Sequence, residues 1–344
     1  MHEKSLAGGQ QAHAARVPLQ ERRAELVFQR ADLSAQRRLR DVKPLGGASH
    51  AALFGHRDEV LQLRQAHDGI VAPERKERHT KTVLVALAEP AHARRVQIER
   101  LGRRQRTPMR LAGRVAAETL RWVGAQLRAG MTTAEVDRLV REDTRRRNAV
   151  PSQLGYHGFP GAVCTSRNDV VCHGIPRDDE TLHDGDIVSI DVTSNLDGWH
   201  GDTCRTFAIG TPTRERAHVM EVAERCCRLG ISIVRDGVRL GDVGHAVDAL
   251  ARAEGCSVVR EVGGHGIGRK MHLPPHVSFF GEPGTGRRLR EGMAITIEPI
   301  VMLGTPRVVT DDDGWTMRTH DGSPAAQFEH TILVTREGCE VLTR

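Results

Sequence analysis

The sequence predicts an α/β (α+β) fold in which helices pack on a curved antiparallel sheet and one structural unit occurs twice. Three observations support this prediction: a β-hairpin signal within residues 187–207, two helices with recognisable end signals, and a constant offset that maps these features onto a second copy. Because several elements share the offset, an internal duplication with a pseudo-two-fold axis explains them together.

The first helix is predicted from about residue 107, because apolar residues recur near helical spacing and Gly130 would cap its end. A second helix follows, where Thr132 and Glu135 form a capping box before an apolar stripe. The same layout returns at Gly237, which precedes a further helix. Gly130 and Gly237 are separated by 107 residues, and this is the offset of the duplication.

The same offset carries one predicted strand onto another. LHDGDIVSID aligns with LREGMAITIE, so that Asp191 corresponds to Glu298. In the first copy the strand continues into a hairpin, and a loop is predicted at residues 195–198 because Asp-Gly suits a tight reversal. That loop would place Asp191 directly opposite Asp202 on the returning strand.

Carboxylates that face each other on neighbouring strands repel, which calls for a compensating charge. Glu329 adds a fourth acid on a strand of the same predicted sheet, besides Asp191, Asp202 and Glu298. Packing four carboxylates together without cations would raise their pKa values, whereas two divalent ions would balance their charge. VGGHGIG places His265 where glycines let the backbone approach closely. The sequence therefore predicts a site for two metal ions.

The composition narrows the class of protein. A chain of 344 residues, 39% of them hydrophobic, is large enough to bury a sizeable core. The sequence contains no run of 18 apolar residues and no secretory signal at its start, so no membrane association is expected. Its seven scattered cysteines include no CxxC pair, which favours reduced thiols in a cytoplasmic protein over a disulfide framework.

The first part of the chain differs in charge from the rest. Residues 1–105 carry 20 Lys and Arg against 12 Asp and Glu, whereas residues 106–344 carry 30 against 32. The net charge of +6 therefore comes from the first segment, and the body has no basic field suited to nucleic acid. We expect residues 1–105 to be either a disordered basic extension or the product of a mistaken translation start.

Six motifs follow one another through residues 107–344: GYHGFP, NDVVCHGIP, IDVTSNLDGWHGDT, GGHGIGRKMH, TIEP and AQFEHT. Together they resemble the type I methionine aminopeptidases. The resemblance implies the pita-bread (creatinase/aminopeptidase) fold, which agrees with the duplication, and makes residues 106–344 the catalytic domain. It also implies metal-dependent removal of the initiator methionine from nascent proteins whose second residue is small.

The resemblance further implies a role for each candidate metal ligand. Asp202 and Glu329 would bridge two divalent ions (Co, Mn, Fe or Zn). Asp191 would serve one ion, and His265 with Glu298 would serve the other. A water between the ions would become hydroxide near neutral pH and attack the peptide carbonyl, while Glu298 is the candidate acceptor for its proton.

Other residues are assigned by the same resemblance to the substrate. His272 would donate a hydrogen bond to the developing oxyanion or the scissile amide, and His173 would position the substrate near the departing amine. The pocket around the methionine side chain would be formed by Tyr156, Phe159, Cys164 and Trp315.

Three features depart from the family pattern. Met271 stands where an aromatic residue is usual, and Gln153 stands where a cysteine is common. Both bear on the shape of the methionine pocket. In addition, Thr107-Pro108 runs directly into Met109, which predicts that the first turns of the opening helix are missing or altered.

Three alternative functional hypotheses remain open. An Xaa-Pro-directed aminopeptidase of the same fold would use the same five ligands, a non-catalytic pita-bread binding protein would share only the fold, and a nucleic-acid-binding protein would rely on the basic extension alone. For the favoured reading we expect a monomer whose partners are the N-termini of nascent polypeptides, with transient ribosome association and no specific nucleic acid.

Overall fold

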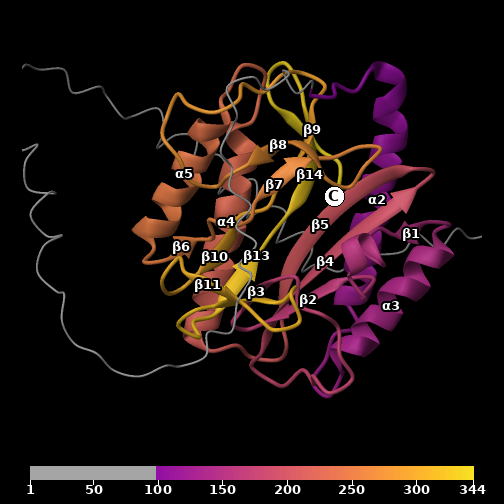
Figure 1. Ribbon diagram of the computed structural model, residues 1–344, viewed down its shortest axis with the longest axis vertical. Coiled ribbons are helices and arrows are strands. Elements are labelled where there is room, and N and C mark those ends of the chain that lie inside the picture. The colour runs from indigo at the N-terminus through magenta and orange to yellow at the C-terminus, as the bar shows by residue number, and fades with distance from the viewer. Residues whose placement is uncertain (1–97) are drawn as a thin grey trace, which may run out of the picture. The chain divides into compact units, whose positions relative to one another are not determined.

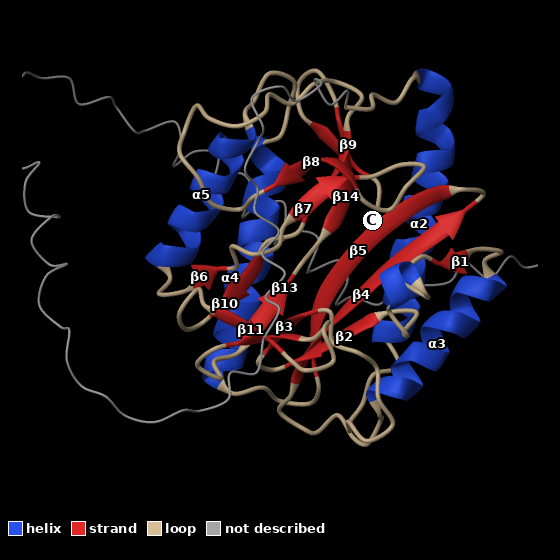
Figure 2. Ribbon diagram, in the orientation of Figure 1, coloured by secondary structure: helices blue, strands red, loops and turns tan. Residues whose placement is uncertain are grey.

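The computed structural model describes residues 98–344, so the expected extension lies outside the described residues as far as residue 97. Figure 1 shows two pairs of helices with the strands between them, and Figure 2 separates the helices from the strands by colour. No helix of the described region is long and apolar enough to cross a membrane. The helices are α2 (Arg103–Gly124), α3 (Thr133–Arg146), α4 (Arg214–Ile233) and α5 (Leu240–Ala253), and a 3-10 turn spans Tyr156–Gly158.

Within residues 98–344 the strands form four antiparallel sheets, with the orders β1-β4-β2 with β5 on β4, β15-β14-β9-β7-β8, β13-β10-β6 and β11-β12-β3. Their bounds are β1 Val150–Pro151, β2 Cys164–Arg167, β3 Val170–Cys172, β4 Ile187–Leu196, β5 Trp199–Ala208, β6 Ser257–Val258, β7 Gly264–Gly266, β8 Leu273–Val277, β9 Ala294–Ile297, β10 Ile300–Met302, β11 Val308–Thr310, β12 Met317–Thr319, β13 Ala325–Gln327, β14 His330–Val334 and β15 Cys339–Val341.

The internal duplication is confirmed by backbone hydrogen bonds that repeat at the predicted offset. Gly130 N–H donates to Leu182 C=O at 2.8 Å, and Gly237 N–H donates to Leu289 C=O at 2.9 Å. Both glycines have left-handed φ values, 88° and 89°, which favour a residue without a Cβ atom. The two copies therefore repeat the path of the chain and not only its composition.

Each copy buries its own apolar cluster between its helices and its sheet. The corresponding residues at the offset are fully buried, namely Val136, Val188 and Ile190 in one cluster and Val243, Ile295 and Ile297 in the other. Successive side chains on a strand point to opposite faces. Because Ile190 and Ile297 point into these clusters, Asp191 and Glu298, which follow them, lie on the opposite side.

The predicted start of the second helix is confirmed, whereas the predicted end of the first is wrong. Thr132 N–H donates to the Glu135 carboxylate at 2.7 Å, and Glu135 N–H donates to the Thr132 hydroxyl at 3.2 Å, so the capping box forms before α3. Helix α2 already ends at Gly124. Gly130 cannot cap it, because its N–H is bonded to Leu182 in the approach to α3.

The first turns of the opening helix, predicted to be missing or altered, are present in α2. The helix begins at Arg103 and continues through Pro108, although a proline at this position removes a main-chain hydrogen bond and crowds the carbonyl four residues earlier. Leu101, two residues before the helix, is buried at 3% exposure. The boundary predicted between residues 105 and 106 therefore falls inside a helix, and residues 98–105 belong to the described body.

Candidate active site

One cavity of about 430 Å³ collects every residue that the sequence assigned to the site. The candidate metal ligands lining it are Asp191, Asp202, His265, Glu298 and Glu329, and the candidate substrate residues lining it are Tyr156, Phe159, Cys164, His173, His272 and Trp315. Met271 and Gln153, the two departures from the family pattern, also line this cavity. Residues as far apart in the sequence as Gln153 and Glu329, 176 positions, thus share one site because both copies contribute to its walls.

The candidate ligands come from two sheets and not from one, which corrects the sequence-based expectation. Asp191 and Asp202 lie on β4 and β5. The other three belong to the five-stranded sheet, where His265 lies on β7, Glu298 directly follows β9, and Glu329 directly precedes β14. The two sheets approach where β5 packs against β14. The spacing of residues within each copy carried no information on this junction.

The predicted register of the β4–β5 hairpin is also wrong, by two residues. Its turn consists of Asp197 and Gly198 alone, whose φ values of 52° and 77° lie in the left-handed region that a type I′ turn requires. Asp202 therefore pairs with Thr193 and not with Asp191. A slip of two residues preserves which face each side chain occupies, so both carboxylates still line the cavity.

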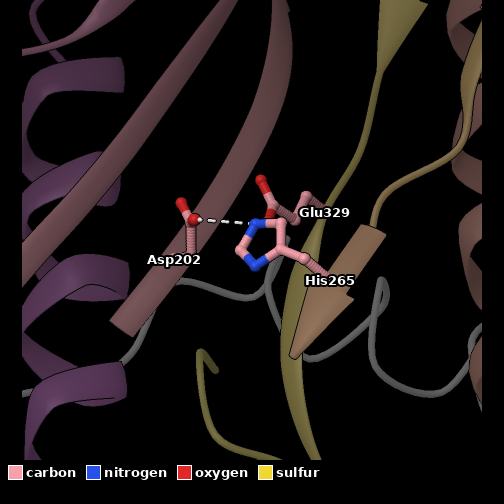
Figure 3. Close-up of side chains that lie close together, drawn as sticks. All are labelled: Asp202, His265 and Glu329. Atoms are coloured by element: carbon pink, nitrogen blue, oxygen red, sulfur yellow. Dashed lines mark ion pairs between the residues drawn. The ribbon is translucent and has the colours of Figure 1, made fainter. Parts of the chain in front are cut away.

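Three of the candidate ligands form a compact group. One ligand atom from each of Asp202, His265 and Glu329 lies within 4.8 Å of the other two, and Figure 3 shows the three side chains close together with the ion pair of Asp202 and His265 marked. Nδ1 of His265 lies 3.0 Å from the carbonyl oxygen of Gly266. Because a carbonyl only accepts, Nδ1 carries a proton, and in the neutral ring Nε2 keeps the lone pair that a metal requires.

The other two candidates extend this group. Oε1 of Glu298 lies 3.6 Å from Nε2 of His265 and accepts a hydrogen bond from the Thr296 hydroxyl at 2.6 Å. The buried atoms Asp191 Oδ1 and Glu329 Oε1 have no hydrogen-bond partner within residues 98–344. Buried polar atoms are nearly always paired. Oxygen-rich surroundings with one imidazole and two orphaned carboxylate oxygens fit divalent metal ions.

Burial and mutual repulsion disturb the carboxyl groups of this site. Burial, followed by the charges of Asp202 and Glu298, raises the pKa of Asp191 well above its usual range. Burial likewise raises the pKa of Glu329, and it raises the pKa of Glu298 to about 7. The ionised forms of these groups therefore need positive charge nearby, and bound cations would provide it.

An apolar wall faces this acidic group. The rings of Phe159 and Trp315 meet edge to face with centroids 5.2 Å apart, and the centroid of His173 lies 6.2 Å from that of Trp315. Cys164 is buried, and burial raises the pKa of its thiol well above the usual range, so it remains neutral. A neutral thiol behaves as a small apolar group, and the wall suits an unbranched apolar side chain.

His272 lies between the acidic group and Tyr156. The ring centroids of His272 and His265 are 4.3 Å apart, and Nδ1 of His272 lies 2.8 Å from the hydroxyl oxygen of Tyr156. Burial, followed by the proximity of His265, lowers the pKa of His272 to about 4, so the ring is neutral near pH 7. When Nδ1 accepts the tyrosine proton, Nε2–H is free to donate to a substrate.

Two residues that the sequence did not single out hold the carboxylates in place. The Thr193 hydroxyl donates to Oδ1 of Asp202 at 2.7 Å, and Nε2 of Gln327 donates to Oε2 of Glu298 at 3.4 Å. The position of Thr193 could have been predicted from the sequence, because it follows Asp191 by two residues and so lies on the same face of the strand. Glu261 and His276 also line the cavity without an assigned role.

Comparison with known proteins gives the family. Residues 107–336 match the model of metallopeptidase family M24. The chain therefore belongs to metallopeptidase family M24. Methionine aminopeptidase A from Synechocystis sp. is 46% identical over 243 residues, which are 71% of this chain and 96% of that protein. These relationships bear out the resemblance read from the six motifs, and the M24 fold is the pita-bread fold that it implied.

Solved structures of related proteins share the fold of this chain. The crystal structure of methionine aminopeptidase from Rickettsia prowazekii is 42% identical to the chain, with a TM-score of 0.71, and the match covers 72% of this chain and 100% of that one. Prolidase from Pyrococcus furiosus has a TM-score of 0.58 at 19% identity, covering 71% of this chain and 65% of that one. At this identity the prolidase shows the shared fold alone.

Proposed function

We propose that this M24 chain is a type I methionine aminopeptidase, which removes the initiator methionine from nascent proteins with a small second residue. The observation that carries the proposal is the convergence of four carboxylates and one imidazole from both copies beside an apolar wall, in one cavity. The curated relatives at 46–47% identity are methionine aminopeptidases, which supports the same activity. An Xaa-Pro-directed enzyme is less well supported, because the prolidase shares only the fold. A non-catalytic binding protein is less well supported, because all five candidate ligands line the cavity.

We assign two divalent ions, drawn from Co, Mn, Fe or Zn, to the acidic group. Asp191, Asp202, His265, Glu298 and Glu329 would hold them. When bound, such ions polarise the scissile carbonyl and lower the pKa of a water molecule. The orphaned oxygens of Asp191 and Glu329 support this assignment.

The remaining steps fall to side chains of the chain itself. Glu298, a carboxylate beside the proposed ions, would take up the proton of the attacking water. Nε2–H of His272 would donate to the oxyanion or the scissile amide. His173, whose pKa burial lowers, would position the departing amine, and the methionine side chain would lie against Tyr156, Phe159, Cys164 and Trp315.

The test is release of methionine from Met-Ala-Ser by metal-free protein, with and without added Mn, Co or Fe. Metal-dependent release of methionine, with no cleavage of an Xaa-Pro peptide, is expected. Preferential cleavage of the Xaa-Pro peptide would favour the alternative, and no cleavage of either peptide with any of the metals would overturn the proposal.

The cellular setting is part of the proposal. Work on nascent chains requires the compartment of protein synthesis, and the cytoplasm also suits a protein whose seven cysteines are all free. We propose a monomer that associates only transiently with ribosomes and binds no specific nucleic acid. Light scattering and co-sedimentation with ribosomes at several salt concentrations test these two points.

We also propose residues 106–344 as the catalytic domain, with residues 1–97 dispensable for hydrolysis. Protein truncated before residue 98 keeps the whole of α2 and should release methionine as fast as the full chain. Intact-mass measurement of the natively expressed protein would show whether residues 1–105 are made at all, and a mass that includes them would refute a mistaken translation start.

A further inference from the structure

The edge of β4 that faces away from β5 is covered by two strands placed end to end. Strand β2 pairs with β4 as far as Asp191, and β1 pairs with it from Ser194 onward. Ser152 N–H adds one more bond, to Thr193 C=O at 2.8 Å. In the gap between these strands, Thr193 N–H has no main-chain partner among the described residues, whereas Asp191 pairs with Cys164 at the end of β2.

The main chain cannot fill this gap, because it leaves β4 at Gln153. Tyr156 N–H donates to Gln153 C=O at 2.9 Å, and Gly155 has a φ of 77°, so the chain turns away into the 3-10 turn. This departure brings Tyr156 and Phe159 to the cavity wall. Its consequence is that the buried N–H of Thr193 on β4 needs another partner.

The side chain of Gln153 bonds to the main chain of β4 at two points, just beyond the end of β2. Its Nε2 donates to Asp191 C=O at 2.8 Å, and its Oε1 accepts from Thr193 N–H at 3.1 Å. The carbonyl only accepts and the N–H only donates, so the two partners fix the orientation of the amide. Gln153 is 6% exposed. Its amide bonds to β4 in the way that a peptide group of a neighbouring strand would, at the point between the ends of β1 and β2.

The two main-chain groups held in this way belong to residues that carry the candidate metal ligands. Asp191 is itself a candidate ligand with an orphaned Oδ1. Thr193 holds Asp202 through the bond from its hydroxyl. Leaving Thr193 N–H unpaired would cost about 1–3 kcal/mol, and the backbone that carries both carboxylates would lose a restraint at each end of the amide.

We propose that Gln153 is a positioning residue of the metal site, whose side-chain amide fixes β4 so that Asp191 and Asp202 point at the same ions. The inference rests on the proposed function, because it assumes that these carboxylates bind metal. It also explains how a polar residue lines the methionine pocket: both ends of its amide are committed to β4, which leaves its methylene groups to face a ligand.

The first test compares Gln153→Met, which keeps the length of the side chain and removes the amide, with wild type. Gln126→Met is the matched control, because Gln126 donates to Trp122 C=O at the end of α2 and does not line the cavity. Amide exchange of Thr193 is followed by NMR in metal-free protein, binding of Mn²⁺ or Co²⁺ by calorimetry, and hydrolysis of Met-Ala-Ser by kcat and KM.

In Gln153→Met we expect faster exchange at Thr193 and metal binding weakened about tenfold or more, as for other residues that orient metal ligands. At limiting metal, kcat should fall while KM for the peptide stays unchanged. The control should match wild type in all three measurements. Unchanged exchange together with unchanged metal affinity would overturn the proposal, and so would a change confined to KM, which would make Gln153 a pocket residue only.

Gln153→Glu distinguishes the bond to Asp191 C=O from the bond with Thr193 N–H. It is also the variant to use if Gln153→Met does not fold. A carboxylate still accepts from Thr193 N–H but cannot donate to Asp191 C=O, so slow exchange at Thr193 should persist while metal affinity falls. Unweakened metal binding by this variant would count against the proposal. If wild type binds metal but releases no methionine, the proposed function fails, whereas exchange and metal affinity still test the role of Gln153.

Discussion

Nε2 of His265 on β7 lies 3.6 Å from Oδ2 of Asp202 on β5, although the two residues belong to different copies of the duplicated unit. At this separation a single ion can contact both atoms. Asp202→Asn removes the charge of a proposed metal ligand and should lower methionine release by at least about 100-fold, more than the loss of a residue that only orients a ligand.

Asp248→Asn is the control for this variant, because Asp248 pairs with Arg252 on α5 and does not line the cavity. A chelator should abolish activity in wild type, and added Mn, Co or Fe should restore it. Full activity in demonstrably metal-free protein would contradict the metal site.

Substitution of His272 separates substrate chemistry from metal binding. His272→Ala should reduce kcat for Met-Ala-Ser about 10²–10³-fold, because a donor to the developing oxyanion is lost. Metal affinity, measured by calorimetry on metal-free protein, should change far less, since His272 is not among the proposed ligands. An unchanged kcat would remove His272 from the mechanism, and a comparable loss of metal affinity would make it a ligand.

Trp315 tests the apolar wall. Trp315→Ala removes the ring that packs on Phe159 with centroids 5.2 Å apart, and the wall loses much of the contact area expected for methionine. We predict a higher KM for Met-Ala-Ser and weaker discrimination between N-terminal methionine and leucine, by about 1–3 kcal/mol in kcat/KM. If discrimination is unchanged, the methionine side chain binds elsewhere in the cavity.

The outcome of the sequence-based predictions depended on whether the decisive interaction was local. The capping box of Thr132 and Glu135 was predictable, because its two hydrogen bonds join residues three apart. The offset that links Gly130 to Gly237 was also readable, since each copy repeats the same turn. The identities of the candidate ligands followed from this duplication and from the family motifs.

The sequence-based predictions were wrong where a short segment is compatible with two loop conformations, or where the decisive contact joins segments distant in the sequence. The residues 195–198 suit either a four-residue or a two-residue loop, and only the complete pairing of β4 with β5 selects the turn at Asp197 and Gly198. Gly130 carries a C-capping signal, but its N–H is used by Leu182, 52 positions further along. Gln153 gave no sign of its role, because both its partners lie on a strand about 40 residues away.

The turn itself can be tested through Gly198. Its φ of 77° is left-handed, so Gly198→Ala should reduce the free energy of unfolding by about 1–2 kcal/mol, measured by urea denaturation. A Cβ atom there would also lie 2.7 Å from the end of the flexible Arg269 side chain. Gly338→Ala is the control, because Gly338 has no left-handed φ and nothing lies within 4 Å of its added Cβ. Equal stability of the two variants would contradict the type I′ turn.

Asp321 should contribute to stability in a pH-dependent way. Its hydrogen bonds with Ser323, followed by the one from Thr305 N–H, lower its pKa to about 2. Since the pKa is lower in the folded state than the unfolded value of about 4, the ionised form favours folding. This contribution is complete above about pH 4 and is lost as the pH falls through about 2.

Asp321→Asn should therefore be less stable than wild type at neutral pH, with a difference that shrinks under acid conditions. Urea denaturation of both proteins across this pH range measures it. A difference that stays constant down to the acid end, or one that grows there, would contradict the assigned bonds.

The division of the candidate ligands between the copies has a practical consequence. A cut at the exposed Gly210, just after β5, would leave one polypeptide with Asp191 and Asp202 and the other with His265, Glu298 and Glu329. Neither fragment would hold a full set of donors. Catalysis by a mixture of the two would then report their reassociation, which makes the protein a candidate for a split-enzyme sensor.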